Sequence, residues 1–126
     1  MKVNLSDGEW KLMNKLWEGE ALTIAQLTAA LREETDWGKH TVITMLSRLE
    51  AKGAVCHDGG TPAKRYSATL ERGDAAQTET RSFLDKVYGG QLGLMMSAMV
   101  DSHTLTQADI DELAAILEKA KGGEDK

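Results

Sequence analysis

The strongest pattern of apolar and polar positions lies in residues 37–53. Apolar side chains recur there at positions i, i+3, i+4 and i+7, which places them on one face of an α-helix. These residues are Val42, Met45, Leu46 and Leu49. We expect this face to pack against a core. We also expect the helix to end at Gly53, because glycine readily adopts the left-handed conformation found at helix C-termini.

The opposite face of this predicted helix carries short hydrogen-bonding side chains and a single acid, Glu50. Its other members are His40, Thr41, Thr44, Ser47, Arg48 and Ala51. Threonine and serine contact phosphates or bases without bulk, arginine forms two hydrogen bonds with guanine, and a helix N-terminus attracts phosphate. A solvated face that is short of acids would explain the same residues, so the segment that follows decides between the two interpretations.

A hairpin is predicted directly after this helix. Two short runs, residues 54–58 and 64–70, flank a turn that contains glycine and proline. Apolar and polar residues alternate over residues 66–69, as in a half-buried strand, and the basic residues Lys64 and Arg65 stand beside the turn. A helix that leads into such a hairpin is typical of a winged helix-turn-helix. In that fold the helix enters the major groove of DNA and the wing contacts the backbone.

Two further helices are predicted before this unit. Ser6 with Glu9, and Thr23 with Gln26, have the spacing of capping boxes, which mark helix N-termini. Tryptophan and methionine side chains recur at helical spacing in the first of these helices, which is typical of core packing. Three helices and a hairpin together predict a winged-helix DNA-binding domain over residues 1–71.

Residues 72–126 show three shorter amphipathic helical patterns. Such helices bury little apolar surface by themselves, so we expect a dimerisation domain in which their apolar faces meet those of a second copy. The alternative is that they fold back onto their own winged-helix domain. The predicted fold class is mainly α (α+β), a winged helix-turn-helix domain followed by a C-terminal helical dimerisation domain. The side chains expected at the dimer interface are Phe83, Leu84, Val87, Tyr88, Leu92, Met95, Met96, Met99, Ile110, Leu113 and Leu117.

The net charge of −5 argues against a nucleic-acid partner until its distribution is considered. In residues 1–70 nine basic residues balance nine acidic ones, whereas residues 71–126 contain six basic and eleven acidic residues. Residues 37–65 contain five basic and two acidic residues, so the expected contact surface is locally positive. Because the excess acid lies in the C-terminal part, we expect weak non-specific binding and a strong dependence on specific contacts.

Four segments of the chain form a recognisable set. They are LSDGEWKLMNKLW near the start, TVITMLSRLEAKG in the third predicted helix, SFLDKVYGG after the hairpin and DIDELAAILE near the end. In order and spacing they resemble the penicillinase and methicillin-resistance repressors of the BlaI/MecI type, a family that also includes copper-responsive repressors. The resemblance covers about residues 5–120. It implies a homodimeric winged-helix transcriptional repressor that binds a two-fold symmetric double-stranded DNA operator.

The resemblance also assigns residues to the DNA contact. The family's wing corresponds to residues 59–65, and its DNA-reading helix to the helix predicted above. Where the β-lactam-responsive members carry Lys and Gln, this chain has His40 and Ile43, so we expect its operator to differ at those bases. Ile43 is expected to contact a thymine methyl group. The complete set of expected contacts is Lys39, His40, Thr41, Ile43, Thr44, Ser47 and Arg48 in the groove, with Lys52, Lys64 and Arg65 on the backbone.

Neither release signal of the family's two branches is matched in this sequence. In the β-lactam branch a protease cuts an Asn-Phe bond in the dimerisation domain, and the aligned position here is Ala98-Met99. The copper branch carries paired cysteines near its C-terminus, and the tail KAKGGEDK has none. We therefore expect an inactivating protease or an inducer as a partner, and the sequence does not identify which one.

Other chemistry has weak support in the sequence. Cys56 and His57 are adjacent, but neighbouring strand residues point to opposite faces, which disfavours their binding one metal ion together. We expect Cys56 to be a small buried residue and His57 to be a surface residue. No phosphate-binding glycine loop, zinc-protease pair or nucleophile motif is present, so no enzyme activity, metal or cofactor is predicted.

The sequence also indicates a cellular compartment, and it leaves two other functions open. It has a single cysteine, no recognisable leader and no apolar run of about 18 residues, so we expect a cytoplasmic protein with no membrane partner. One alternative function is a winged-helix protein-interaction module that docks through its acidic C-terminal unit. The other is a sensor that responds to a metal or a small molecule.

Overall fold

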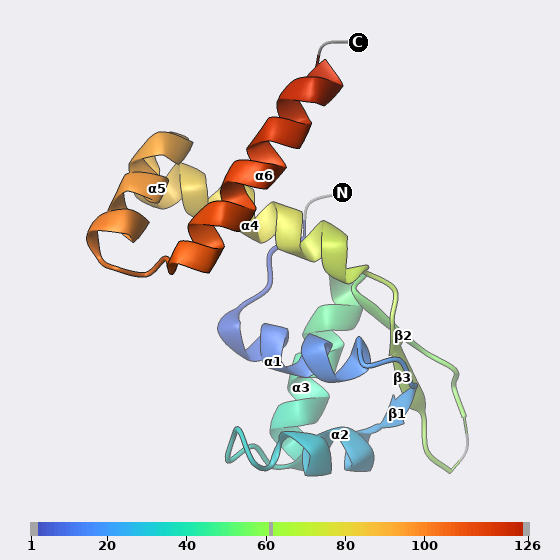
Figure 1. Ribbon diagram of the computed structural model, residues 1–126. Coiled ribbons are helices and arrows are strands. Elements are labelled where there is room, and N and C mark those ends of the chain that lie inside the picture. Colours follow the sequence, from blue (N-terminus) through green and yellow to red (C-terminus); the bar gives the residue numbers. More distant parts are fainter. Residues whose placement is uncertain (1–2, 61, 125–126) are drawn as a thin grey trace. The chain divides into compact units, whose positions relative to one another are not determined.

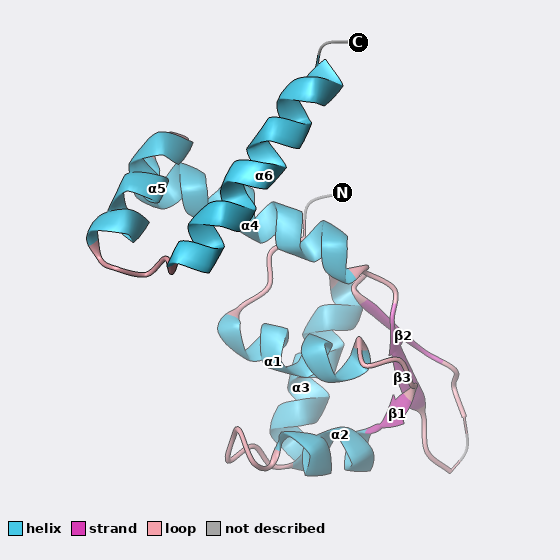
Figure 2. Cartoon of the chain, viewed as in Figure 1, coloured by secondary structure: helices cyan, strands magenta, loops and turns pink. Residues whose placement is uncertain are grey.

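The computed structural model describes residues 3–60 and 62–124, which form helices and one small sheet (Figures 1 and 2). In chain order the elements are α1 (Asp7–Leu16), β1 (Leu22–Thr23), α2 (Ile24–Leu31), α3 (Lys39–Ala51), β2 (Val55–His57), β3 (Arg65–Ala68), α4 (Arg72–Tyr88), α5 (Leu92–Asp101) and α6 (Gln107–Glu124). This architecture confirms the predicted mainly α fold class with a winged helix. No helix of the described ranges is long and apolar enough to cross a membrane.

The chain divides into two compact units, one up to Arg81 and one from Ser82 onward. The division lies inside α4, whereas the sequence pattern places the domain boundary at residue 71, before that helix. The first turns of α4 belong to the first unit because Ala75 is buried in its core. The role of residues 72–126 in dimerisation stays a prediction.

The helix starts follow the predicted capping boxes. At α1 the Ser6 amide donates to Glu9 Oε1 at 2.8 Å, and the Glu9 amide donates to Ser6 Oγ at 3.2 Å. Thr23 and Gln26 make the same reciprocal pair at α2, at 2.9 and 3.1 Å. These bonds satisfy amide groups that have no partner inside a helix, which is why short polar residues at this spacing select the start. Both predicted capping boxes are confirmed.

The core of the first unit is built around one face of α3. The predicted stripe is buried in full, since Val42, Met45, Leu46 and Leu49 are the buried residues of this helix. Leu12 and Met13 of α1 and Leu27 and Leu31 of α2 are fully buried in the same cluster. Helix α3 ends as predicted, with Gly53 at a φ of 80°. Burial of this stripe determines which face of α3 remains open to solvent.

The sheet has the order β1-β3-β2, with both pairs antiparallel (Figure 2). The predicted hairpin is present as β2 and β3, although both strands are shorter than the predicted runs, residues 54–58 and 64–70. Thr61, in the predicted turn, lies outside the described residues. Strand β1 was not predicted, because two residues are too short to show a period of two. Its pairing of Leu22 with Tyr66 completes the sheet.

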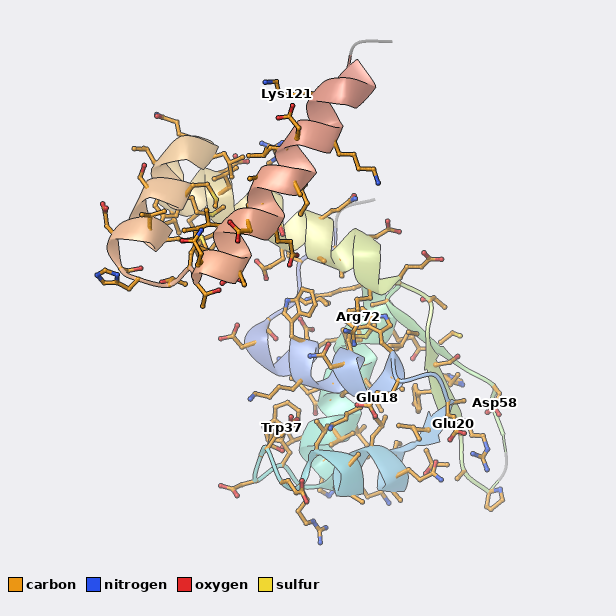
Figure 3. All side chains as sticks on the ribbon, viewed as in Figure 1. Glu18, Glu20, Trp37, Asp58, Arg72 and Lys121 are labelled. Carbon is orange, nitrogen blue, oxygen red and sulfur yellow. The ribbon has the colours of Figure 1, made fainter. Side chains whose placement is uncertain are left out.

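Two tryptophans of α1 hold the segment that leads into α4. The indole N–H of Trp17 donates to the Leu70 carbonyl at 2.8 Å, and the indole N–H of Trp10 donates to Glu79 Oε1 at 3.1 Å. The guanidinium of Arg72, labelled in Figure 3, lies 5.3 Å from the centre of the Trp17 ring. The predicted packing role of these rings is therefore only part of their function. Their polar edges fix the first turns of α4 to α1.

The second unit leaves most of its large apolar side chains exposed. Over residues 82–122, whose side chains are described, Leu84 alone is buried, and α5 has no buried residue. The exposed side chains are Phe83 (46%), Val87 (50%), Leu92 (54%), Leu94 (52%), Val100 (51%), Ile110 (41%), Ile116 (53%) and Leu117 (61%). Exposed apolar surface on this scale is unusual for a monomer and typically marks an interaction site.

Glu9 is the one buried charged side chain among the described residues, with 2% of its surface exposed. Besides the Ser6 amide, its Oε1 accepts a hydrogen bond from Lys52 Nζ at 2.5 Å. Lys52 Nζ also donates to the Asn4 carbonyl at 2.7 Å. Since Lys52 is the C-cap residue of α3, this pair ties the C-terminal end of α3 to the N-terminal end of α1.

The surroundings of Glu9 favour its charged form. Burial raises the pKa of the Glu9 carboxyl, but the hydrogen bond and charge of Lys52 and the hydrogen bonds from Ser6 lower it by more. The pKa therefore lies below its ordinary value of 4.5. A carboxyl whose pKa falls on folding stabilises the fold above its ordinary pKa, and this contribution is lost as the pH falls through the folded-state pKa. The ion pair is thus fully stabilising at neutral pH and lost in acid.

Replacing Lys52 by methionine should leave the Glu9 carboxylate buried without its cation. We expect the free energy of unfolding to fall by about 2 kcal/mol, less than for a fully buried pair because the Lys52 side chain is 37% exposed. The measurement is urea unfolding followed by tryptophan fluorescence. The difference from wild type should shrink as the pH falls below 4.5, where Glu9 becomes protonated.

The matched control is Lys11→Met, which removes an exposed lysine of α1 that has no ion pair within residues 3–60 and 62–124. We expect this change to stay within about 0.5 kcal/mol of wild type. Equal unfolding free energies for the Lys52 and Lys11 variants would contradict the assigned role of the Glu9–Lys52 pair.

Candidate nucleic-acid interface

The face of α3 opposite the core is open to solvent. Ile43 is half-buried at its margin. The exposed residues on this face are Lys39, His40, Thr41, Thr44, Ser47 and Arg48. Because the buried stripe holds α3 in place, these side chains are presented on a rigid element and not on a mobile loop. All seven residues predicted for the groove are therefore accessible at least in part, although accessibility alone does not assign a contact.

The start of α3 is suited to an anion. Its N-cap residue, Gly38, has no side chain to accept from the first amides of the helix, and the first turn contains no acid. The first amides therefore keep the partial positive charge of a helix N-terminus, and the exposed Lys39 adds a full charge beside them. A phosphate group would be stabilised at this end of the helix.

Thr44 presents different chemistry from the other hydroxyl groups of this face. Its Oγ1 donates to the His40 carbonyl at 3.0 Å, one turn earlier in the helix. The hydroxyl proton is therefore used inside α3, and the lone pairs and the methyl group remain for a ligand. Thr44 is thus suited to accept from an amino group or to contact a thymine methyl.

The hairpin between β2 and β3 carries the two basic residues predicted for the wing, Lys64 and Arg65, and both are exposed. Asp58, labelled on the hairpin in Figure 3, closes its base. Its Oδ1 accepts from the Arg65 amide at 3.0 Å and from the Gly60 amide at 2.7 Å. These amide hydrogen bonds lower the pKa of the Asp58 carboxyl. The charged carboxylate therefore holds the turn at neutral pH.

His57 lies between the last turn of α3 and the wing. Its Nε2 is 3.3 Å from Glu50 Oε2, and its Nδ1 accepts from the Gly59 amide at 3.1 Å. The imidazole centre is 5.3 Å from that of Tyr66, its cross-strand partner. Sequence reasoning placed His57 on the surface but missed these partners. The only available signal was Glu50, the single acid on the polar face of α3.

Lys52 occupies a different position from the one expected. It was assigned to the DNA backbone, but its ammonium group is engaged by Glu9 and the Asn4 carbonyl inside the domain. No local pattern connects residues 9 and 52, so this partner is visible only in the folded chain. We assign Lys52 to the support of α3, and its contact with DNA stays an untested prediction.

Cys56 is exposed, which corrects the expectation that it is buried. Val55 takes the inward position in β2, with 3% of its surface exposed, so the alternation of the strand turns Cys56 outward. Its Sγ lies 3.5 Å from Ser67 Oγ on the neighbouring strand. Within the described ranges, no three His, Cys, Asp or Glu side chains gather as a metal site would require.

Comparisons with known proteins identify the family of the chain. The sequence profile of the penicillinase repressor family matches residues 5–119. The penicillinase repressor of Bacillus licheniformis is 29% identical over 117 residues, which cover 93% of this chain and 91% of that protein. The methicillin resistance regulatory protein MecI of Staphylococcus aureus is 27% identical over 115 residues, or 91% of this chain and 94% of MecI.

A solved structure extends the likeness to the fold. The monomeric form of Bacillus licheniformis BlaI, determined in complex with the blaP half-operator, superposes with a TM-score of 0.51 at 26% sequence identity. The match covers 59% of this chain and 90% of that one. The shared part is thus about the size of the first compact unit, which contains α3 and the wing.

Proposed function

The chain belongs to the penicillinase repressor family, as its four sequence motifs predicted, and on this premise we propose that it is a DNA-binding transcriptional repressor. It acts as a homodimer that recognises a two-fold symmetric operator and blocks transcription by occupying it. The observation that carries the proposal is the exposed, acid-poor face of α3 next to a basic wing, on a fold shared with a BlaI structure determined with half-operator DNA.

Helix α3 supplies the groups that read bases. Arg48 is exposed and has no ion pair within the described ranges, so its guanidinium is available to form two hydrogen bonds with guanine. The Thr44 methyl and the half-buried Ile43 suit thymine methyl groups. Lys39 and the open amides at the helix start suit a phosphate at the edge of the groove. The helix therefore combines positioning and sequence reading.

The wing supplies positioning. Lys64 and Arg65 lie next to one another on the hairpin, where the carboxylate of Asp58 accepts from the Gly60 and Arg65 amides, so hydrogen bonds restrain the backbone at Arg65. Contacts of this kind go to phosphates and do not distinguish bases. We therefore assign Arg48 to specificity and Lys64 to affinity.

The second unit supplies the surface that binds a second copy of the chain. Eight large apolar side chains between Phe83 and Leu117 are 41–61% exposed. Burying this surface against a second chain would remove it from water, and the family profile extends across it to residue 119. A symmetric dimer would then present two α3 helices to two half-sites.

The first test is fluorescence anisotropy of the protein titrated onto its own upstream intergenic DNA and onto a scrambled duplex. We expect binding to its own DNA to be tighter by about 10³-fold or more, at each of two salt concentrations. Equal binding to both duplexes, followed by no enriched sequence in a selection from random duplexes, would overturn the proposal. The acidic C-terminal unit would then be examined as a docking face for another protein.

Arg48→Ala and Lys64→Ala should weaken DNA binding in different ways. Arg48→Ala should cost about 1–3 kcal/mol on the operator and relax the preference at one base pair. Lys64→Ala should weaken binding to all sequences alike and reduce the salt slope by about one. Lys11→Ala on α1 is the charge-matched control and should change neither quantity. A uniform loss with Arg48→Ala would reassign this residue to a phosphate contact.

Sedimentation velocity tests the dimer. We expect the wild-type protein to sediment as a dimer at micromolar concentration and Leu92→Glu to shift it to a monomer, because the added carboxylate would be buried in the apolar contact. Gln91→Glu adds the same charge at the neighbouring position without removing apolar surface and should stay dimeric. A wild-type monomer would contradict the proposed role of the second unit.

A further inference from the structure

The recognition helix and the wing are joined by one side chain that contacts both. The His57 side chain, 24% exposed, reaches Glu50 in the last turn of α3 through Nε2 and accepts the Gly59 amide in the wing turn through Nδ1. Gly59 has a φ of 69°, a left-handed conformation that favours glycine and gives this turn its shape. The hydrogen bond to His57 therefore holds a residue whose left-handed backbone helps to set the path of the chain after β2.

The two contacts specify the form of the imidazole. A nitrogen that accepts from an amide N–H carries no proton, so in neutral His57 the proton lies on Nε2. Nε2, which then carries the proton, lies 3.3 Å from Glu50 Oε2. Both ring nitrogens are thus used, one toward the helix and one toward the wing, in a single tautomer.

The groups around His57 restrict it further. Tyr66 of β3 is buried and lies against the imidazole at an interplanar angle of 60°. Arg65 and Asp58 flank this pair, and the Asp58 amide donates to the Arg65 carbonyl at 3.2 Å. Because the ring of Tyr66 lies beside the imidazole, with ring centres 5.3 Å apart, packing restricts the movement of the imidazole in addition to the Gly59 hydrogen bond.

We propose that His57 is a positioning residue that couples the wing to the recognition helix, so that Lys64 and Arg65 reach the DNA backbone when α3 occupies the groove. The inference rests on the proposed DNA-binding function and adds a residue that is itself expected to make no base contact. If the coupling is real, loss of either His57 contact removes the contribution of the wing while α3 still reads its bases.

Two substitutions separate the contacts. In His57→Asn the side-chain oxygen occupies the place of Nδ1, so it can accept from the Gly59 amide, but the side chain is too short for Glu50. In His57→Gln the amide nitrogen takes the place of Nε2 and can donate to Glu50, but nothing accepts from Gly59. Since the coupling needs both ends, both variants should lose the wing contribution.

The test is a double-mutant cycle between His57 and Lys64 on operator affinity, measured by anisotropy with the full-length protein. We expect the factor by which Lys64→Ala weakens binding to shrink by more than about twofold in each His57 background, as for residues in one network. The His57 variants alone should also lower the salt slope. Effects that combine within about twofold of independence would overturn the inference, because Lys64 would then act without His57.

Cys56→Ser is the matched control, since Cys56 is exposed on the same strand and its only side-chain hydrogen bond among the described residues is to Ser67. It should leave the effect of Lys64→Ala unchanged. Glu50→Gln retains an oxygen that accepts from Nε2–H, so it should preserve the coupling, whereas Glu50→Ala should abolish it. Coupling that survives Glu50→Ala would overturn the inference, because the wing would then be linked to α3 without the Glu50–His57 contact.

A second measurement needs no DNA. The ¹⁵N chemical shifts of the His57 ring should show that Nδ1 carries no proton, and the Gly59 amide should exchange more slowly in wild type than in His57→Gln. A ring protonated at Nδ1, or equal exchange rates, would overturn the His57 contacts themselves. If the wild-type protein showed no specific DNA binding, the proposed function would fail, and these spectra would still decide whether His57 joins α3 to the wing.

Discussion

Burial of one face of α3 is the constraint on which the rest of the structure depends. Val42, Leu46 and Leu49 are fully buried, so the helix cannot rotate without exposing them to water. The opposite face is therefore held toward solvent, and its short polar side chains are presented with little conformational freedom. The Glu9–Lys52 pair adds a second restraint at the end of the helix. A helix supported in this way suits recognition of a groove, because few groups have to be ordered when a ligand binds.

The two compact units meet the hydrophobic constraint in different ways. The first unit buries apolar residues of α1, α2, α3, the first turn of α4 and the sheet in one cluster. The second has three helical segments and one buried large apolar side chain within residues 82–122. A second copy would complete that core, so the proposed dimer follows from the same physical requirement that folds the first unit. Repression by occupancy would then need both units: the first would bind one half-site, and the second would hold two copies together so that both half-sites are bound.

The local sequence pattern predicted a feature correctly where the interacting residues lie close together in the sequence. Both capping boxes, the buried stripe of α3 and its glycine stop depend on residues within a few positions of one another. Such spacings are read directly from the chain because helix geometry is fixed. The hairpin was predicted for the same reason. Its shorter strands and the two-residue β1 were not, because strand length depends on which partners the folded sheet provides.

The sequence by itself determined the helices and the hairpin, the core face of α3, the locally basic segment and the family. The tertiary structure alone decided the partners of the charged and polar side chains: Lys52 with Glu9, His57 with Glu50 and Gly59, and Cys56 on the outer face of its strand. The physical reason is that an apolar stripe has one way to avoid water, whereas a lysine or a histidine can be satisfied by water, DNA or protein. Which of these it meets depends on residues brought together only by folding.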